Sequence, residues 1–397
     1  MKKRVVELAL LLSLAFLAGC GQKEDAAEAV SQEESSPASE IAEDEQTAVD
    51  DGTGQTGTEQ AEPEESGEET QSSPKGEIVT VGKDDAMLRA GMAADTAGID
   101  DKSFNESAWT GLSELNKSVG ARVSYIESPT TEDFGDSLEK LAADGCEICW
   151  GIGYQFSDAI LEAAAKHPDI HYAIVDHTYD EVPQNVTCAT FRSEEPSFLV
   201  GYIAAAVSET GKIGFIGGMQ DKEIESFQYG YMAGAMQADH DYSKKTEVKI
   251  EYLGSFEDPD LGKEKAAAMY EDGCDVIFHA AGGSGTGVIE QAKESGRFAI
   301  GVDSDQSYLA PDNVLTSAIK KVNVVVSNIS VQYSIGDNVG GKTINYGLAE
   351  YAMGIPSEHP NYSDEIYEAA ASMQQRIVSG QIEVPSDSEE FEEFEAE

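Results

Sequence analysis

Short apolar runs alternate with amphipathic stretches from residue 78 to about residue 320, and this alternation restricts the fold more than any other feature of the chain. The expected strands, in chain order, are MLRAGMAA, ARVSYIE, EICWGIG, HYAIVD, NVTCATF, KIGFIGG, VKIEYLG, DVIFHAA, FAIGVD and VLTSAI. Stretches with apolar residues at helical spacing, such as FGDSLEKLAADG and LGKEKAAAMYEDG, lie between most of them. This pattern predicts an α/β fold, with parallel sheets that carry helices on both faces.

The alternation falls into two rounds, the first from Met87 to Phe191 and the second from Lys212 to Asp303, each with about five strands. We therefore expect two doubly wound lobes. In such sheets ligands bind outside the carboxyl ends of the strands. Between two lobes those ends converge, so the sequence predicts a ligand cleft between the lobes.

The first twenty residues have the order of a bacterial lipoprotein signal. A basic start is followed by an apolar run to Phe16 and then by Leu-Ala-Gly before Cys20. We expect residues 1–19 to be removed as a signal peptide and Cys20 to carry two acyl chains, which anchor stably where one chain does not. The apolar run is too short to span a bilayer. The expected location is the extracytoplasmic face of the cell membrane, the extracellular side in a Gram-positive type of envelope.

Composition divides the rest of the chain. Residues 20–77 contain no aromatic side chain before the first expected strand and are predicted to be a disordered acidic tether. Lobe 1 is expected at 78–192, with part of the segment after about 310, and lobe 2 at 193–308. Residues 309–384 would hold crossover segments and C-terminal helices shared by the lobes. Residues 385–397 are expected to be a disordered acidic tail, with weak docking of Phe391 and Phe394 as the alternative.

Charge and cysteine content exclude several classes of function. The formal net charge of −49 makes nucleic acid and anionic lipid headgroups poor ligands and favours a neutral or cationic one. Cys146 and Cys149 form a C-x-x-C, but at the start of an expected strand, whereas a reactive thiolate is stabilised at a helix N-terminus. No second pair of ligands follows at zinc spacing. Buried free thiols are therefore expected for these two and for Cys188 and Cys274.

Polar and aromatic residues gather directly after the expected strands. In chain order the candidates are Asp95, Asp101, Phe104, Asn105, Tyr154, Phe156, Asp176, Phe227, Phe256, Phe278, Gly282, Gly283, Asp303, Asp305 and Lys320. Aromatic rings stack on planar bases, and an ionised carboxylate accepts hydrogen bonds from sugar hydroxyls or from base N–H groups. This combination of aromatic rings and carboxylates is suited to a flat ligand that donates hydrogen bonds.

Each candidate also has a purely structural alternative. Asp95, Asp100 or Asp101 would serve as the N-cap of a helix that begins near Lys102 or Ser103. The glycines of GGSGTG would allow a tight turn, and each phenylalanine would fit a core. These alternatives stay open for single residues, and the concentration of candidates at one edge of the sheets favours binding.

Known catalytic and cofactor motifs are missing from the sequence. GGSGTG fits neither the dinucleotide-binding nor the phosphate-binding loop pattern, and DTAGIDDKSFNE lacks the spacing of a calcium loop. VDSDQ would suit a calcium-dependent nucleoside hydrolase acting through Asp303 and Asp305, but no further carboxylates are adjacent. We therefore expect no enzyme activity, no cofactor and no metal site.

Six motifs in order resemble the basic membrane protein family of ABC-transporter substrate-binding lipoproteins, whose best understood members are purine nucleoside receptors. They are AADTAGIDDKSFNESAWTGL, FLVGYIAAAVSETGKIGFIGGM, SFQYGYMAGA, DVIFHAAGGSGTGVIEQAK, AIGVDSDQ and LTSAIKKV. The resemblance covers about residues 85 to 330. It implies a periplasmic-binding-protein-like fold, in which two Rossmann-like lobes close on a nucleoside.

The resemblance also implies roles for site residues. In the first lobe, Asp95 and Asn105 would lie near the ligand, Phe104 would cover one face of the base, and Asp176 would be a further carboxylate facing the ligand, with Tyr154 as a secondary candidate. In the second lobe, Phe278 would be the opposing ring, with Phe227 and Phe256 as alternatives. The backbone would approach the ligand closely at Gly282 and Gly283. Asp303 and Lys320 would contact the ribose.

The function implied is an extracytoplasmic, lipid-anchored protein that binds guanosine, inosine, adenosine or a similar nucleoside. It would deliver this ligand to an ABC permease and its ATPase subunits. Two alternatives share the fold: a lipoprotein that binds a sugar or a signalling furanose, and a sensory ligand receptor.

Overall fold

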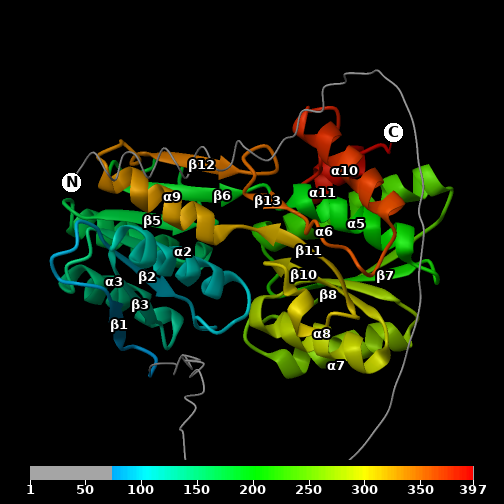
Figure 1. Ribbon diagram of the computed structural model, residues 1–397, viewed down its shortest axis with the longest axis horizontal. Coiled ribbons are helices and arrows are strands. Elements are labelled where there is room, and N and C mark those ends of the chain that lie inside the picture. Colours follow the sequence, from blue (N-terminus) through cyan, green and yellow to red (C-terminus); the bar gives the residue numbers. More distant parts are fainter. Residues whose placement is uncertain (1–73, 397) are drawn as a thin grey trace, which may run out of the picture. The chain divides into compact units, whose positions relative to one another are not determined.

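The computed structural model describes residues 74–396, and its ribbon is shown in Figure 1. The predicted signal peptide, Cys20 and nearly all of the predicted tether lie outside the described residues. Within residues 74–396 the strands form two separate sheets. The predicted α/β class is confirmed, because neighbouring strands are parallel except at one edge of each sheet.

The first sheet has the strand order β1-β3-β2-β4-β5-β6-β12. Its strands are β1 (Ile78–Val81), β2 (Arg89–Ala94), β3 (Arg122–Glu127), β4 (Ile148–Gly151), β5 (His171–Val175), β6 (Val186–Phe191) and β12 (Lys342–Tyr346). Strand β1 pairs antiparallel with β3 and closes one edge, while β12 pairs parallel with β6 at the other.

The second sheet has the order β13-β11-β10-β9-β7-β8. Its strands are β7 (Lys212–Gly217), β8 (Glu247–Tyr252), β9 (Val276–Ala280), β10 (Phe298–Asp303), β11 (Val314–Lys320) and the short β13 (Met353–Gly354), which pairs antiparallel with β11. The sequence prediction missed β1, β12 and β13. All three are short edge strands, and β1 and β12 are partly exposed, so neither presents the continuous apolar run of a buried parallel strand.

Alternate side chains of the first sheet enter two apolar layers. On β4, Ile148 and Trp150 pack with helix α2 (Phe104–Val119) and helix α9 (Val322–Ser334), whereas Cys149 packs with α3 (Phe134–Ala143) and α4 (Ser157–Lys166). Successive side chains of a strand point to opposite faces, so both faces of the sheet are covered. Single-turn helices η1 (Thr131–Asp133) and η2 (Tyr154–Phe156) precede α3 and α4.

The second sheet is covered in the same way. Helices α5 (Glu194–Val207), α6 (Lys222–Tyr242) and α10 (Asp364–Val378) lie on one face, and α7 (Pro259–Glu271) and α8 (Gly285–Ser295) on the other. The turns η3 (Gly282–Ser284) and η4 (Gln306–Leu309) follow β9 and β10. Helices α5 and α6 approach closely at Gly234, where an added Cβ would lie 1.9 Å from the Phe198 carbonyl oxygen. A glycine is therefore required at this crossing.

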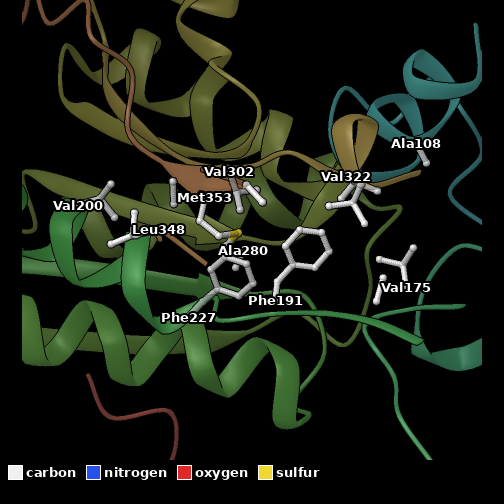
Figure 2. Packing of buried hydrophobic residues seen from close by; sticks show 14 of the residues in the cluster. Ala108, Val175, Phe191, Val200, Phe227, Ala280, Val302, Val322, Leu348 and Met353 are labelled. Atoms are coloured by element: carbon white, nitrogen blue, oxygen red, sulfur yellow. The ribbon is translucent and has the colours of Figure 1, made fainter. Parts of the chain in front are cut away.

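The chain passes between the two sheets three times. It leaves the first sheet after β6, returns from β11 through α9 to β12, and crosses again to β13. We call the first sheet with its helices lobe 1 and the second sheet with its helices lobe 2. The expected end of lobe 2 at residue 308 was too early, because β11 pairs with β10 inside the second sheet. One apolar cluster contains residues of both lobes, among them Val175, Phe227 and Val302 (Figure 2).

The C-terminal segment differs from the expected disordered tail. Residues Ser388–Glu393 form helix α11, whose N-cap Asp387 accepts hydrogen bonds from the backbone N–H groups of Glu389 and Glu390. The Phe394 ring meets the Phe198 ring edge-on at 6.2 Å between centroids, and the ring of Phe391 lies 5.8 Å from that of Tyr229. The acidic composition dominated the prediction, although two aromatic side chains are enough to dock this segment on α5 and α6.

Two further features concern the described residues as a whole. No helix among residues 74–396 has the length and apolar character needed to cross a membrane. The four cysteines in this part of the chain, Cys146, Cys149, Cys188 and Cys274, are buried free thiols.

Candidate ligand-binding site

A cavity lies between the two lobes, at the carboxyl ends of their strands. It holds about 670 Å³ including the part open to solvent. Lobe 1 contributes Asp95, Ala97, Asp101, Phe104, Asn105, Gly153, Tyr154, Gln155 and Asp176. Lobe 2 contributes Glu223, Ile224, Phe227, Phe256, Ala280, Gly282, Val302, Asp303 and Lys320.

Most candidates from the sequence line this cavity. The structure brings together Asp95, Phe104, Asn105, Asp176, Gly282, Asp303 and Lys320, and also the secondary candidates Tyr154, Phe227 and Phe256. Asp101 lines it as well, whereas four candidates do not: Phe156, Phe278, Gly283 and Asp305. Phe156 is fully buried in the core of lobe 1, and Asp305 is exposed. The site thus forms where strand ends of both lobes meet.

Phe278 was the wrong choice for a second ring at the cavity. Its side chain is fully buried, with its ring centroid 5.3 Å from that of Tyr231 and 5.6 Å from that of Phe215. Phe278 lies two residues before the end of β9, so it packs beneath Phe227, whose ring centroid is 6.2 Å away. Ala280, at the strand end, reaches the cavity instead.

Gly283 lies where the backbones of the two lobes approach each other. An added Cβ there would lie 3.2 Å from the Phe256 carbonyl oxygen and 3.7 Å from the Asp101 Cβ of lobe 1. Its neighbour Gly282 lines the cavity and has a φ of +53°, which a glycine adopts without strain.

Three phenylalanine rings line the cavity beside Tyr154: Phe104 from the start of α2, and Phe227 and Phe256 from lobe 2. The Phe256 ring lies directly against Gly218, since an added Cβ at that glycine would be 2.3 Å from two of its ring atoms. The Phe104 ring lies close to Gly153, with 3.6 Å between its Cε1 atom and an added Cβ. Small residues behind both rings leave them room beside the cavity.

Lys320 is the centre of a buried charge cluster at the end of β11. Its side chain is 2% exposed, and its Nζ donates to Asp176 Oδ2 at 2.7 Å and to Glu223 Oε1 at 2.8 Å. The ammonium also lies 4.9 to 5.5 Å from the ring centroids of Phe104, Phe191 and Phe227. We call Lys320, Asp176, Glu223 and Asp303 the lysine cluster.

Burial affects the ionisation of this cluster. Burial raises the pKa of Asp176, and the neighbouring Glu223 charge raises it further. Although burial opposes its charge, the carboxylates of Asp176, Glu223 and Asp303 hold the pKa of Lys320 above its usual value. Lys320 therefore stays charged, and three carboxyl groups share one ammonium.

A second polar cluster surrounds Asn105 in lobe 1. Asn105 Nδ2 donates to Asp95 Oδ1 at 2.8 Å and to Asp101 Oδ2 at 3.2 Å. Asp101 also accepts from the backbone N–H groups of Ser103, Asn105 and Glu106, so it caps helix α2 as the sequence suggested. Burial raises the pKa of Asp101 to about 7 and also raises that of Asp95. We call Asp95, Asp101 and Asn105 the asparagine cluster.

The lobes touch through polar contacts beside the cavity. The Ser103 hydroxyl of lobe 1 donates to the Asp303 carboxylate of lobe 2. Gln306 Nε2 of lobe 2 donates to the Lys102 carbonyl oxygen of lobe 1 at 2.9 Å. Lys102 and Asp303, one in each of these contacts, have a positive φ, so strained backbone is found at both.

Sequence reasoning missed Glu223 and Gln306 as members of the site region. Glu223 lies in the first turn of α6, six residues after β7, and is therefore not one of the residues that directly follow a strand. Helix N-termini face the same edge as the carboxyl ends of parallel strands. A polar residue in the first turn of the helix that follows a strand is the sequence signal that indicates such a position.

The arrangement supports binding of a flat ligand that donates hydrogen bonds. Rings line the cavity, and its polar groups are dominated by carboxyl oxygens. Among residues 74–396 no group of three or more histidines, cysteines and carboxylates is placed to hold a metal ion.

Comparison with known proteins gives a consistent result. Residues 89–388 match the family model Bmp, described as ABC transporter substrate-binding protein PnrA-like. Basic membrane protein A of Borreliella burgdorferi is 43% identical over 301 residues, which cover 74% of this chain and 87% of the relative. A CD4+ T-cell-stimulating antigen of Listeria monocytogenes is 35% identical over 315 residues, again 74% and 87% of the two chains.

Solved structures share the fold at lower identity. A solute-binding protein of an ABC transporter system from Aeropyrum pernix superposes with a TM-score of 0.70 at 23% identity, covering 77% of this chain and 96% of that one. An ABC transporter solute-binding protein from Conexibacter woesei gives a TM-score of 0.61 at 20% identity over 75% and 99% of the two chains. Both likenesses support the two-lobed fold.

Proposed function

This chain belongs to the Bmp family of PnrA-like ABC transporter substrate-binding proteins, and we propose that it binds purine nucleosides in the cavity between its lobes. Substrate-binding proteins hold a ligand and pass it to a permease without changing it chemically, so the chain is not an enzyme. The nucleoside hydrolase considered from VDSDQ is thereby excluded.

One observation carries the choice of ligand: the cavity is lined both by phenylalanine rings and by two groups of polar side chains. The asparagine cluster belongs to lobe 1, and the lysine cluster is centred on Lys320 at the end of β11 in lobe 2. A nucleoside combines the features that suit such a lining, with polar groups on the base, a flat ring system and hydroxyls on the ribose.

In the proposed arrangement the base stacks on Phe104, with Phe256 or Phe227 on its other face. The asparagine cluster meets the polar edge of the base. The ribose hydroxyls point to Asp303 and to the lysine cluster, where carboxyl oxygens accept their hydrogen bonds. Aromatic stacking contributes roughly 1–3 kcal/mol per base, and hydrogen bonds to charged groups about 1.5–3 kcal/mol each.

The proposal extends to transport. We infer that the mature protein is anchored through acyl chains on Cys20 at the extracytoplasmic face of the membrane and delivers its ligand to an ABC permease and its ATPase subunits. The signal-like order of the first twenty residues and the family membership support this. Ligand binding between hinged lobes gives the permease a closed form to recognise.

A thermal-shift panel tests the ligand class. Protein freed of bound ligand is heated with guanosine, inosine, adenosine, uridine, ribose, galactose or glucose. We expect the purine nucleosides to raise the midpoint, because ligand at 100 times Kd stabilises by about 2.7 kcal/mol. Stabilisation by the sugars alone would replace the proposal with sugar binding.

A further inference from the structure

We propose that the asparagine cluster presents only hydrogen-bond acceptors to the ligand and thereby selects 6-oxopurine nucleosides, guanosine above all, over adenosine. This inference rests on the proposed function, since it names which nucleosides the same cavity prefers. It depends on how the Asn105 amide is oriented.

The orientation of that amide is fixed by two neighbouring carboxyl groups. Asn105 Nδ2 lies 2.8 Å from Asp95 Oδ1 and 3.2 Å from Asp101 Oδ2. A flipped amide would place its oxygen against two acceptor oxygens and lose both hydrogen bonds. The chemistry of the neighbours therefore assigns nitrogen to this side and oxygen to the other.

The two carboxyl groups cannot easily turn away. Asp101 is held by the backbone N–H groups of Ser103, Asn105 and Glu106, at 2.8 to 3.0 Å. Asp95 Oδ1 accepts from the backbone N–H of Ala97 at 2.9 Å. Because the first turn of α2 and the β2–α2 connection hold both groups, the Asn105 orientation is built into the backbone.

With the Asn105 amide held in this orientation, two acceptor atoms remain for a ligand. Asn105 Oδ1 is buried and has no hydrogen-bond partner among the described residues. Asp95 uses Oδ1 for both of its hydrogen bonds, which leaves Oδ2 available. Both residues line the cavity. A buried acceptor without a partner is costly, so a ligand that supplies N–H donors here is favoured.

The one ammonium that lines the cavity in the described part of the chain is engaged away from the asparagine cluster. Lys320 donates to Asp176 and Glu223 in the lysine cluster. The Tyr154 hydroxyl lies near the Asp221 carboxylate and the Gln155 side chain, both of which affect its pKa. A ligand acceptor placed at the asparagine cluster would therefore meet other acceptors.

Purine bases differ in how many hydrogen-bond donors they can offer to the two acceptor atoms of this site. Guanine carries N1–H and the 2-amino group side by side, two adjacent donors. Hypoxanthine keeps N1–H and lacks the amino group. Adenine has an acceptor at N1, which would face Asn105 Oδ1 or Asp95 Oδ2. A site built to hydrogen-bond a ligand group strongly rejects the analogue that lacks it, because the buried partner stays unsatisfied.

Calorimetric titration of the ligand-depleted protein with guanosine, inosine, adenosine and 1-methylguanosine tests the inference. We expect guanosine to bind most tightly and inosine next. Adenosine and 1-methylguanosine, which lack the N1–H donor, should bind about 10- to 100-fold more weakly than guanosine.

Two variants test whether the asparagine cluster causes the selectivity. Asp95→Asn replaces an acceptor with an amide that also donates, so the guanosine-to-adenosine affinity ratio should fall at least about fivefold. Asp100→Asn is the matched control, because Asp100 is exposed and does not line the cavity; its ratio should equal that of the unchanged protein. The ratio, unlike the affinity for one ligand, does not change with a general loss of stability.

The outcomes separate the two proposals. If purine nucleosides bind but adenosine matches guanosine within about twofold, the selectivity inference is wrong and the proposed function stands. If no purine nucleoside binds, the proposed function fails and the inference fails with it. An unchanged ratio in Asp95→Asn would also overturn the inference, because it would remove these side chains from the choice of base.

Discussion

Asp303 is the residue on which binding of a ribose would depend most directly. It is 7% exposed, ends β10 with a φ of +65°, and already accepts a hydrogen bond from the Ser103 hydroxyl at one of its oxygens. An aspartate adopts this left-handed backbone more easily than most residues. The second carboxyl oxygen is left for a ligand.

Replacing Asp303 should therefore weaken binding. Asp303→Ala removes hydrogen bonds to a charged group, worth about 1.5–3 kcal/mol, so guanosine affinity should fall roughly 10- to 150-fold. Calorimetric titration measures this. Asp305→Ala is the matched control, because that side chain caps η4 through the backbone N–H of Ser307 and does not line the cavity. Equal affinity of Asp303→Ala and the unchanged protein would remove Asp303 from the site.

Residues at strand ends could be predicted, and residues placed by packing could not. Asp95 and Asp176 directly follow β2 and β5, Asp303 ends β10, and the carboxyl ends of parallel strands share one edge. Phe278 and Phe256 look alike in the sequence, since each is a phenylalanine near a strand end. Only tertiary packing decides that Phe278 lies beneath Phe227 and that Phe256 faces the cavity.

At the scale of elements, α11 stabilises lobe 2 through its aromatic side chains. Phe394 is partly buried against Phe198, and complete burial of a phenylalanine contributes about 1.5–3 kcal/mol. Phe394→Ala should lower the free energy of unfolding by about 1–2 kcal/mol, measured by urea denaturation. Glu392→Ala, an exposed change on the same helix, should have no effect. No difference between the two variants would show that the C-terminal segment is free in solution.

The turn η4 connects ligand binding to contact between the lobes. Gln306 is fully buried; its Oε1 accepts from the Val302 backbone N–H at 3.0 Å, and its Nε2 donates to the Lys102 carbonyl oxygen. Gln306→Glu keeps the acceptor within lobe 2 and replaces the donor between the lobes by an oxygen, which repels that carbonyl.

We expect Gln306→Glu to favour separated lobes. The radius of gyration of the ligand-free protein in X-ray scattering should rise, and nucleoside affinity should fall about 10-fold, because closure then costs more. Gln220→Glu, an exposed change in lobe 2, is the control. Unchanged scattering and unchanged affinity in Gln306→Glu would contradict a role for this contact in closure.

For the whole molecule, the balance of buried acids and histidines sets the response to pH. Burial raises the pKa of Asp101 to about 7 and that of Glu194 to about 8, above the values of 3.8 and 4.5 in an unfolded chain. The folded state thus holds protons that the unfolded state has lost, and this stabilisation disappears as pH rises to about 8. Burial lowers the pKa of His171 and His279 to about 4, so these residues act in the opposite direction only below about pH 6.5.

The melting temperature should therefore fall between pH 6.5 and pH 8.5, by roughly 3–8 °C. Differential scanning calorimetry of the ligand-free protein measures it. Glu194→Gln should flatten the slope, whereas Glu209→Gln, an exposed carboxamide substitution, should leave it unchanged. A melting temperature that rises across this interval would contradict the assignment of buried, protonated carboxyl groups.

The fold of the whole molecule could largely be predicted, since buried parallel strands are continuous apolar runs and the helices between them are amphipathic. The path of the chain after β11 could not. Strand β12 pairs with β6, and β13 with β11, over long separations in sequence, and their residues carry little apolar pattern of their own. Helix α9 returns the chain to lobe 1, where α2 meets it closely: an added Cβ at Gly111 would lie 2.3 Å from the Asn323 carbonyl oxygen.

Native mass spectrometry of the purified protein, before and after addition of guanosine, tests the central claim most directly. We expect either a complex with a co-purified purine nucleoside or, after its removal, a single added guanosine per chain that inosine displaces. A spectrum that shows only the free protein at saturating guanosine, inosine and adenosine would contradict the proposed function.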